Sequence, residues 1–123
     1  MAGEPSTRVL RIAQGVREEL AALLADEVRD PGAAGAVVTR VEMAGDLRGA
    51  RVAVRLLEGG DDPARRKHLI ASLTRAAGML RREVGQRLGL RFAPELRFFY
   101  DDGSDNASRV EQLLAEIEAE RRK

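Results

Sequence analysis

Arginine dominates the polar chemistry available to this 123-residue chain. Nineteen of its 21 basic residues are arginine, whose planar guanidinium group forms paired hydrogen bonds with phosphate and stacks on nucleobases. The whole chain has a net charge of +1, but its basic residues are unevenly distributed. The stretch 63–97 contains two acidic residues and nine basic ones, so it carries a net charge of +7 that could attract a polyanion. The basic residues are Arg65, Arg66, Lys67, Arg75, Arg81, Arg82, Arg87, Arg91 and Arg97.

Groups suited to catalysis or metal binding are scarce. His68 is the single histidine and cysteine is absent, which leaves no thiolate or paired imidazole ligands for zinc and no cysteine nucleophile. The acidic pairs at 61–62 and 101–102 flank glycine-containing turns, where aspartate commonly caps the backbone. The serines have no recognisable partner base, and no phosphate-binding glycine loop is present. We therefore predict no catalytic residue, no metal site and no cofactor.

The basic stretch is predicted to be helical. Asp62 is a suitable N-cap and Pro63 a suitable first helical residue. Apolar residues then recur at helical spacing, but Gly78 interrupts them at a cost of about 1 kcal/mol relative to alanine. We predict two helical segments that meet, at an angle, at Ala76, Ala77 and Gly78.

Outward-facing arginines on this helix are the candidate nucleic-acid site. Leu80, Val84 and Leu88 form its inner stripe, so Arg82 is expected to point nearly opposite, with other arginines beside it. Two more arginines open the first predicted helix. The candidate RNA-binding residues are Arg8, Arg11, Arg75, Arg81, Arg82, Arg87 and Arg91.

The elements around this helix predict one small domain. Residues 1–6 are expected to be flexible, a helix to run from Thr7 to about Val28, and two strands, 37–44 and 50–57, to form an antiparallel hairpin. A third strand over 95–101 places Phe99 on the face opposite Leu96, Phe98 and Tyr100, beside Arg97. Alternation in the first strand groups Val37, Thr39, Val41 and Met43 on one face.

A last helix is predicted over about 107–121. Residues 7–103 are therefore expected to form the main domain and residues 104–123 a C-terminal helix or tail. Three strands with one-sided helices indicate an α+β fold, with the helices on one face of a three-stranded sheet. No apolar run is long enough to span a membrane.

Three stretches have a more specific pattern: 8–14 (RVLRIAQ), 41–47 (VEMAGDL) and 94–101 (PELRFFYD). With these stretches the chain resembles the ribosome-binding factor A family, whose fold is similar to a type II KH domain with an added C-terminal helix. KH domains place a GxxG loop between two consecutive helices, whereas this family has an Ala-x-Gly kink there, matched by 76–78. The GxxG at 32–35 lies between a helix and a strand, so we interpret it as a linker.

The resemblance implies a non-enzymatic factor that binds the 30S ribosomal subunit and 16S rRNA. It further implies assistance in late 30S maturation and in 16S 5′-end processing, a role in growth at low temperature and a monomeric state. The cytoplasmic location is expected instead from the absence of cysteine and of a secretory signal segment.

Other interpretations of the residues stay open. The arginines could form an ordinary solvated helix surface. The chain could also be a protein-interaction module that docks on another assembly factor through the hairpin or C-terminal helix. A small hydrolase lacks a nucleophile and base, and a KH-like regulator of other RNAs lacks the GxxG loop between the helices.

Overall fold

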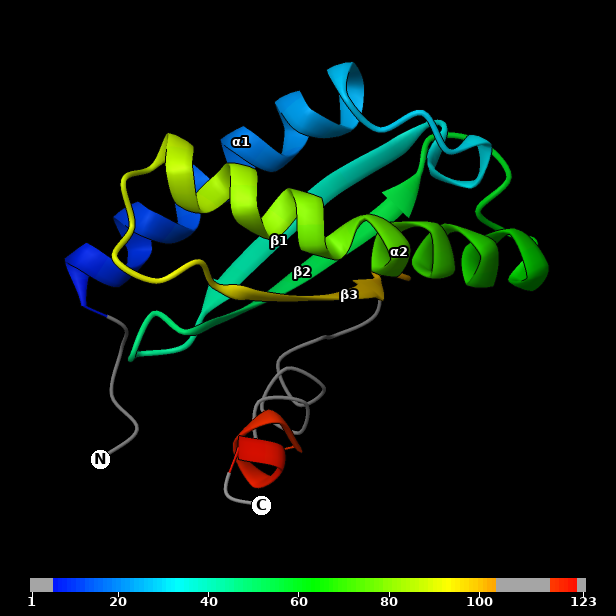
Figure 1. Cartoon of the computed structure of the whole chain (residues 1–123). Coiled ribbons are helices and arrows are strands. Elements are labelled where there is room, and N and C mark those ends of the chain that lie inside the picture. The colour runs from blue at the N-terminus through cyan, green and yellow to red at the C-terminus, as the bar shows by residue number, and fades with distance from the viewer. Residues whose placement is uncertain (1–5, 104–115, 122–123) are drawn as a thin grey trace.

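The computed structural model describes residues 6–103 and 116–121, which contain two long helices and one sheet (Figure 1). Residues 116–121 are also helical, while the rest of the helix predicted over 107–121 lies outside the described residues, as do residues 1–5. The predicted α+β fold is confirmed. Its elements are α1 (Thr7–Asp26), the short 3-10 helix η1 (Pro31–Ala33), β1 (Ala36–Met43), β2 (Gly49–Leu56), α2 (Pro63–Arg87) and β3 (Glu95–Tyr100).

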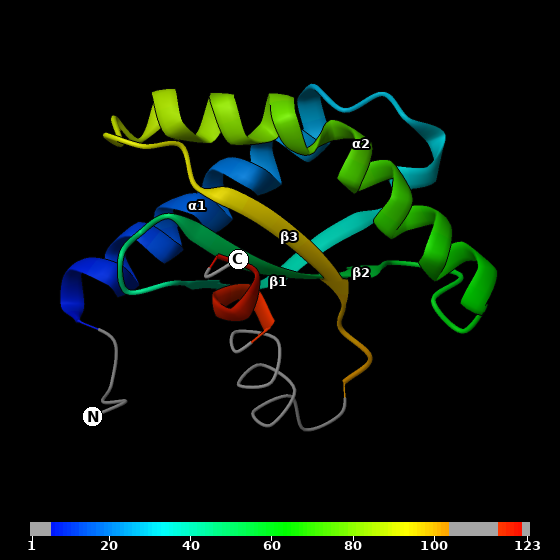
Figure 2. The same cartoon turned by 60° about the horizontal axis from the view of Figure 1, so that its bottom comes forward.

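The three strands form a mixed sheet in the order β1-β2-β3. The hairpin pair β1–β2 is antiparallel, as predicted, and β2–β3 is parallel. A parallel pair needs a long crossover connection, and α2 provides it. Helices α1 and α2 pack on one face of the sheet, while the helical turn 116–121 lies on the other side (Figures 1 and 2). The predicted one-sided arrangement therefore holds for α1 and α2.

Each long helix begins at a capping residue. The hydroxyl of Ser6 accepts a hydrogen bond from the backbone N–H of Val9 at 3.1 Å, so Ser6 is an N-cap. The carboxylate of Asp62 accepts from the N–H of Ala64 at 2.9 Å, as its position before Pro63 predicts. Such caps satisfy backbone donors that the first helical turn leaves unpaired.

The core lies between the two helices and the sheet. Leucines at 20, 23, 69, 73 and 80 are fully buried and pack with Val52 and Val54 of the central strand. Because this stripe holds the inner side of α2 against the sheet, the charged residues of α2 are confined to its outer side.

Helix α2 is one continuous helix of 25 residues. It remains helical through Ala76, Ala77 and Gly78, so the two predicted segments form a single element. The helix axis nevertheless bends near its middle, which both views show (Figures 1 and 2).

A β-bulge in β1 changes which residues face the helices. Val38 pairs with Val54, but the next pair along the ladder is Arg40 with Ala53, so Thr39 is an extra residue. A bulge of this kind shifts the alternation of side chains by one position.

The predicted face of β1 is therefore partly wrong. Val38 is buried in the core with Met43, and Val41 packs against the same cluster. The hydroxyl of Thr39 instead donates hydrogen bonds to the carbonyl of Ala53 at 3.2 Å and to the carboxylate of Asp101 at 2.7 Å. Strict alternation groups Thr39 with the core residues because it assumes that no residue is inserted.

Two glycines of α2 provide a matched stability test. A Cβ on the exposed Gly78 would meet no atom within 4 Å, whereas a Cβ on the buried Gly85 would lie 3.1 Å from the Cβ of Ala93. We expect Gly78→Ala to raise the free energy of unfolding by about 1 kcal/mol, because alanine is the better helix former. Gly85→Ala should be the less stable of the two variants in urea denaturation. Equal free energies of unfolding would show that the loop containing Ala93 can move to accommodate the added methyl group at little cost.

Candidate nucleic-acid interface

All seven predicted RNA-binding arginines are exposed. Six of them belong to the start of α1, the second half of α2, or the loop after it, which lie at the same end of the molecule (Figures 1 and 2). Arg75 lies near the middle of α2. The structure therefore brings most of the predicted site to one end of the domain.

Three of these arginines have no side-chain partner among the described residues, whereas Arg81 donates to the carbonyl of Ala93 and Arg91 lies over the ring of Phe92. Within residues 6–103 and 116–121, Arg8, Arg11 and Arg82 form no ion pair. An exposed guanidinium without a carboxylate partner keeps all its donors for a phosphate. These three side chains are thus well suited to contact a nucleic-acid backbone.

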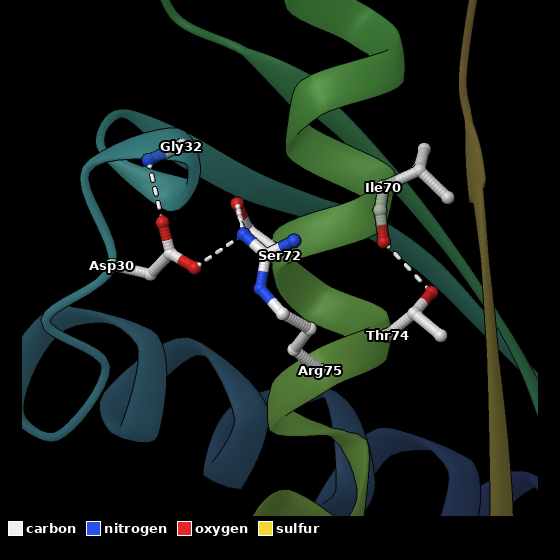
Figure 3. Close-up of polar contacts among 6 residues, drawn as sticks. All are labelled: Asp30, Gly32, Ile70, Ser72, Thr74 and Arg75. Atoms are coloured by element: carbon white, nitrogen blue, oxygen red, sulfur yellow. Dashed lines mark hydrogen bonds and ion pairs between the residues drawn. The ribbon is translucent and has the colours of Figure 1, made fainter.

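Arg75 is held by the loop that precedes β1. Its guanidinium donates to the carboxylate of Asp30 at 2.7 Å and to the hydroxyl of the buried Ser72 at 3.1 Å (Figure 3). The other carboxylate oxygen of Asp30 accepts from the backbone N–H of Gly32 at 2.9 Å. The hydrogen bond from Arg75, followed by that from Gly32, lowers the pKa of Asp30 below its usual value. Arg75 therefore links α2 to η1, and its charge is partly offset.

Arg87 is also paired. Its guanidinium lies 3.3 Å from the carboxylate of Glu19 on α1 and 3.7 Å from that of Glu83, one turn earlier on α2. Such half-exposed pairs contribute little to stability, but they compete with phosphate for the guanidinium. Arg87 is therefore a weaker candidate than Arg82.

Gly78 leaves a position without a side chain between the arginines of α2. Arg75 lies three residues before it, and Arg81 and Arg82 lie three and four residues after it, which are the neighbouring positions on a helix surface. With open space where a side chain would be, the helix backbone is accessible between the guanidinium groups. This arrangement allows a sugar-phosphate backbone to approach α2 closely.

The sequence prediction missed Arg48. It precedes β2, and its guanidinium lies 4.9 Å from the ring centroid of Phe92, with Arg91 at 5.4 Å from the same ring. Phe92 is 52% exposed. An exposed aromatic next to Arg91 was a signal available in the sequence, but the contribution of Arg48 depends on the tertiary fold.

On the opposite face of the sheet, Phe99 packs against a different arginine from the one expected. The guanidinium of Arg51 lies 4.3 Å from the centroid of its ring, and Arg51 is only 3% exposed. Burial lowers the pKa of Arg51, and the nearby carboxylate of Glu42 opposes that shift. Since Arg51 is buried, it is a structural residue of the sheet.

The other polar candidates have structural surroundings. Besides its contact with Thr39, Asp101 accepts a hydrogen bond from the backbone N–H of Gly103 at 3.0 Å, as a turn aspartate does. His68 is exposed on α2 near Gly32. Among the described residues, no group of three histidine, cysteine or acidic side chains could hold a metal ion. None of the helices described is long and apolar enough to cross a membrane.

Comparison with known proteins identifies the family. The model of the family "Ribosome-binding factor A" matches residues 8–114. The chain belongs to the ribosome-binding factor A family. The ribosome-binding factor A of Sorangium cellulosum is 49% identical over 110 residues, which cover 89% of this chain and 88% of that protein.

Solved structures of the ribosome-binding factor A family share the fold. The solution structure of a Thermotoga maritima protein matches with a TM-score of 0.67 and 31% identity, covering 83% of this chain and 94% of that one. A homology model of Thermus thermophilus ribosome-binding factor A, as fitted into the cryo-EM map of a complex of that protein with 30S, matches with a TM-score of 0.55 and 22% identity. That match covers 80% of this chain and 97% of the other.

The contact between Arg75 and Asp30 predicts a local titration effect. Arg75→Ala removes the main hydrogen bond that lowers the pKa of Asp30, so this pKa should rise towards its usual value. The stabilisation from this contact is present above the usual pKa and is lost as pH falls through the lowered one. An NMR pH titration of the side-chain carboxyl carbons would measure the change. Asp46 is the matched control, because its lowered pKa depends mainly on the backbone N–H of Arg48 and should not move.

Proposed function

We propose that this protein binds the small (30S) ribosomal subunit through 16S rRNA and assists late maturation of the subunit without catalysing a reaction. The observation that carries the proposal is the accessible backbone at Gly78 beside the exposed Arg82, which forms no ion pair within residues 6–103 and 116–121. Membership of the ribosome-binding factor A family supports the same partner. So does the Thermus thermophilus relative, which is described in a 30S complex.

The recognition would depend on the phosphate backbone of folded RNA. Arg8, Arg11, Arg81 and Arg82 offer guanidinium groups from two helices at one end of the domain, so they can contact phosphates of neighbouring strands. Each neutralised phosphate releases counterions, and the affinity should therefore fall steeply with salt. Because such contacts carry little sequence information, the protein would recognise the shape of an rRNA element.

The bend of α2 would take the place of the KH-domain loop. A GxxG loop lets backbone approach backbone between two helices. Here Ala76, Ala77 and Gly78 keep the helix intact, while Gly78 removes the side chain that would block a close approach. We also propose that the protein assists 16S 5′-end processing, contributes to growth at low temperature, is a monomer and is located in the cytoplasm.

Charge reversal on α2 tests the interface. Arg81→Glu with Arg82→Glu should weaken co-sedimentation with immature small subunits in sucrose gradients, because two phosphate contacts become repulsions. The slope of log affinity against log salt should become shallower by about 2, roughly one for each lost contact. Circular dichroism should stay unchanged, since both side chains are exposed.

The control is Arg29→Glu with Arg55→Glu, which changes the net charge equally at two exposed positions away from this end of α2. It should retain most of the binding. Equal losses in the two double variants would mean that net charge alone governs association. Binding that survives both variants and RNase treatment would favour docking on another protein.

A larger side chain at residue 78 tests the close approach. Gly78→Gln should stabilise the helix, because glutamine is the better helix former, and should nevertheless reduce subunit binding by obstructing the RNA. Ala21→Gln, at an exposed position of α1, is the matched control and should bind normally. Full binding by Gly78→Gln would remove residue 78 from the interface.

A further inference from the structure

A hollow lies beside the candidate interface on α2, between the β1–β2 turn and the loop that joins α2 to β3. It is an open hollow of about 450 Å³, within the range of small-molecule sites. Its lining includes Arg48 from the turn, Arg81 from the helix, and Phe92 and Ala93 from the loop. Three segments distant in sequence therefore meet around one hollow.

Phe92 gives the hollow an aromatic surface. Among the residues that the structure describes, the exposed large apolar side chains are Leu10, Leu57 and Phe92, so Phe92 is the aromatic one. Two guanidinium groups, from Arg48 and Arg91, lie over its ring. Stacked arginine and aromatic planes are the surfaces on which unpaired nucleobases pack.

The charge in the hollow is positive. Three arginines and two carboxylates line it: Arg48, Arg81, Arg121, Asp46 and Glu95. Asp46 pairs with Arg121 at 3.1 Å, and Glu95 lies 3.0 Å from Arg97, which it shares with Glu120. Arg48, Arg81 and Arg91 form no ion pair within the described part of the chain. The hollow therefore combines a stacking surface with cations that an anionic ligand can neutralise.

The loop that carries Phe92 is held in place. The carbonyl of Ala93 accepts a hydrogen bond from Nε of Arg81 at 3.0 Å. Ala93 also lies against Gly85, where an added Cβ would be only 3.1 Å from the Cβ and 3.2 Å from the Cα of Ala93, and the next residue, Pro94, is fully buried. Phe92 is thus presented on an anchored loop, which reduces the entropy lost on binding.

We propose that this hollow binds an unpaired nucleotide of RNA. The base would stack against Phe92 or against the outer plane of an arginine that covers it, and the guanidinium of Arg81 or Arg91 would contact the adjacent phosphate. A paired base exposes only its edge in a groove, so the ligand must be single-stranded. The inference rests on the proposed function in that the protein binds RNA, and it adds a contact with a single-stranded element to the contacts with the phosphate backbone.

The test compares Phe92→Ala with the wild-type chain for binding to a labelled oligouridine of about ten nucleotides and to an RNA duplex of similar length. Loss of one stacked base should lower the affinity for the single strand by roughly 5- to 100-fold. The salt dependence should not change, because no phosphate contact is removed. The affinity for the duplex should also stay the same, and Phe92→Trp should restore binding to the single strand.

The control variant is Leu57→Ala, which removes another exposed apolar side chain (72% exposed) at the opposite end of β2. It should bind like the wild type, and circular dichroism should show all variants folded. The proposal is overturned if the wild-type chain does not bind the oligouridine, if Phe92→Ala binds it equally well, or if Phe92→Ala loses single strand and duplex to the same degree.

Co-sedimentation of the wild-type chain with small subunits, measured in parallel, separates this inference from the proposed function. If the wild-type chain binds subunits but Phe92→Ala binds the oligouridine as well as the wild type does, only the proposed nucleotide site in the hollow is rejected. Phe92-dependent binding of oligouridine without any subunit binding would reject the proposed function and leave the hollow as an RNA site.

Discussion

Strand β2 is hydrogen-bonded along both edges and buried on both faces. It pairs with β1 and β3, and seven of its eight residues are buried. Because β3 runs parallel to it, the chain must return to the starting end of β2 before β3 can begin, and α2 makes that return. The helix packs its leucines on the sheet, so its arginines face the solvent. The position of the basic surface of α2 is therefore a consequence of how the central strand is paired.

Arginine has two different roles in this fold, and burial separates them. On the far face of the sheet, Arg51 is almost fully covered and lies against Phe99. A buried charge of this kind is tolerated only with compensating partners, and the nearby Glu42 supplies part of that compensation. On α2, by contrast, Arg82 is exposed and forms no ion pair with the described residues, so its donors are available to an external phosphate. Composition alone cannot distinguish these roles, since both depend on where the strands and helices place each residue.

Local signals in the sequence predict much of this structure. The cap at Asp62, the hairpin and the apolar stripe of α2 are each encoded within a few neighbouring residues. The bulge at Thr39 was not predicted, because a single inserted residue leaves no trace in a pattern of β-branched and polar residues. The ion pair between Arg75 and Asp30 and the approach of Arg48 to Phe92 were also missed. Each joins residues more than 40 positions apart, so they depend on tertiary packing.

The Ala-x-Gly segment interrupts the apolar pattern of α2 in the sequence but does not interrupt the helix. Sequence reasoning identified Gly78 as an interruption of the helix, because glycine is a poor helix former. The structure keeps the helix continuous and bends it, since the packed leucines on either side hold both halves against the sheet. Packing does not require a glycine at residue 78, because an added Cβ would meet no atom within 4 Å; this agrees with the proposed close approach of an RNA backbone to the helix.

The parallel pairing of β2 with β3 also sets an order of events during folding. Strands β1 and β2 are neighbours in the chain and can associate through local contacts, whereas β3 can join only after the loop containing α2 has been closed. Helix α2 and its arginines can therefore form early, in a chain that is still incomplete. The hollow around Phe92 cannot, because Arg48 and Phe92 become neighbours only when β3 aligns beside β2. If both proposals hold, a partly folded chain would attract RNA by charge alone, and the proposed single-stranded site would form only with the last strand.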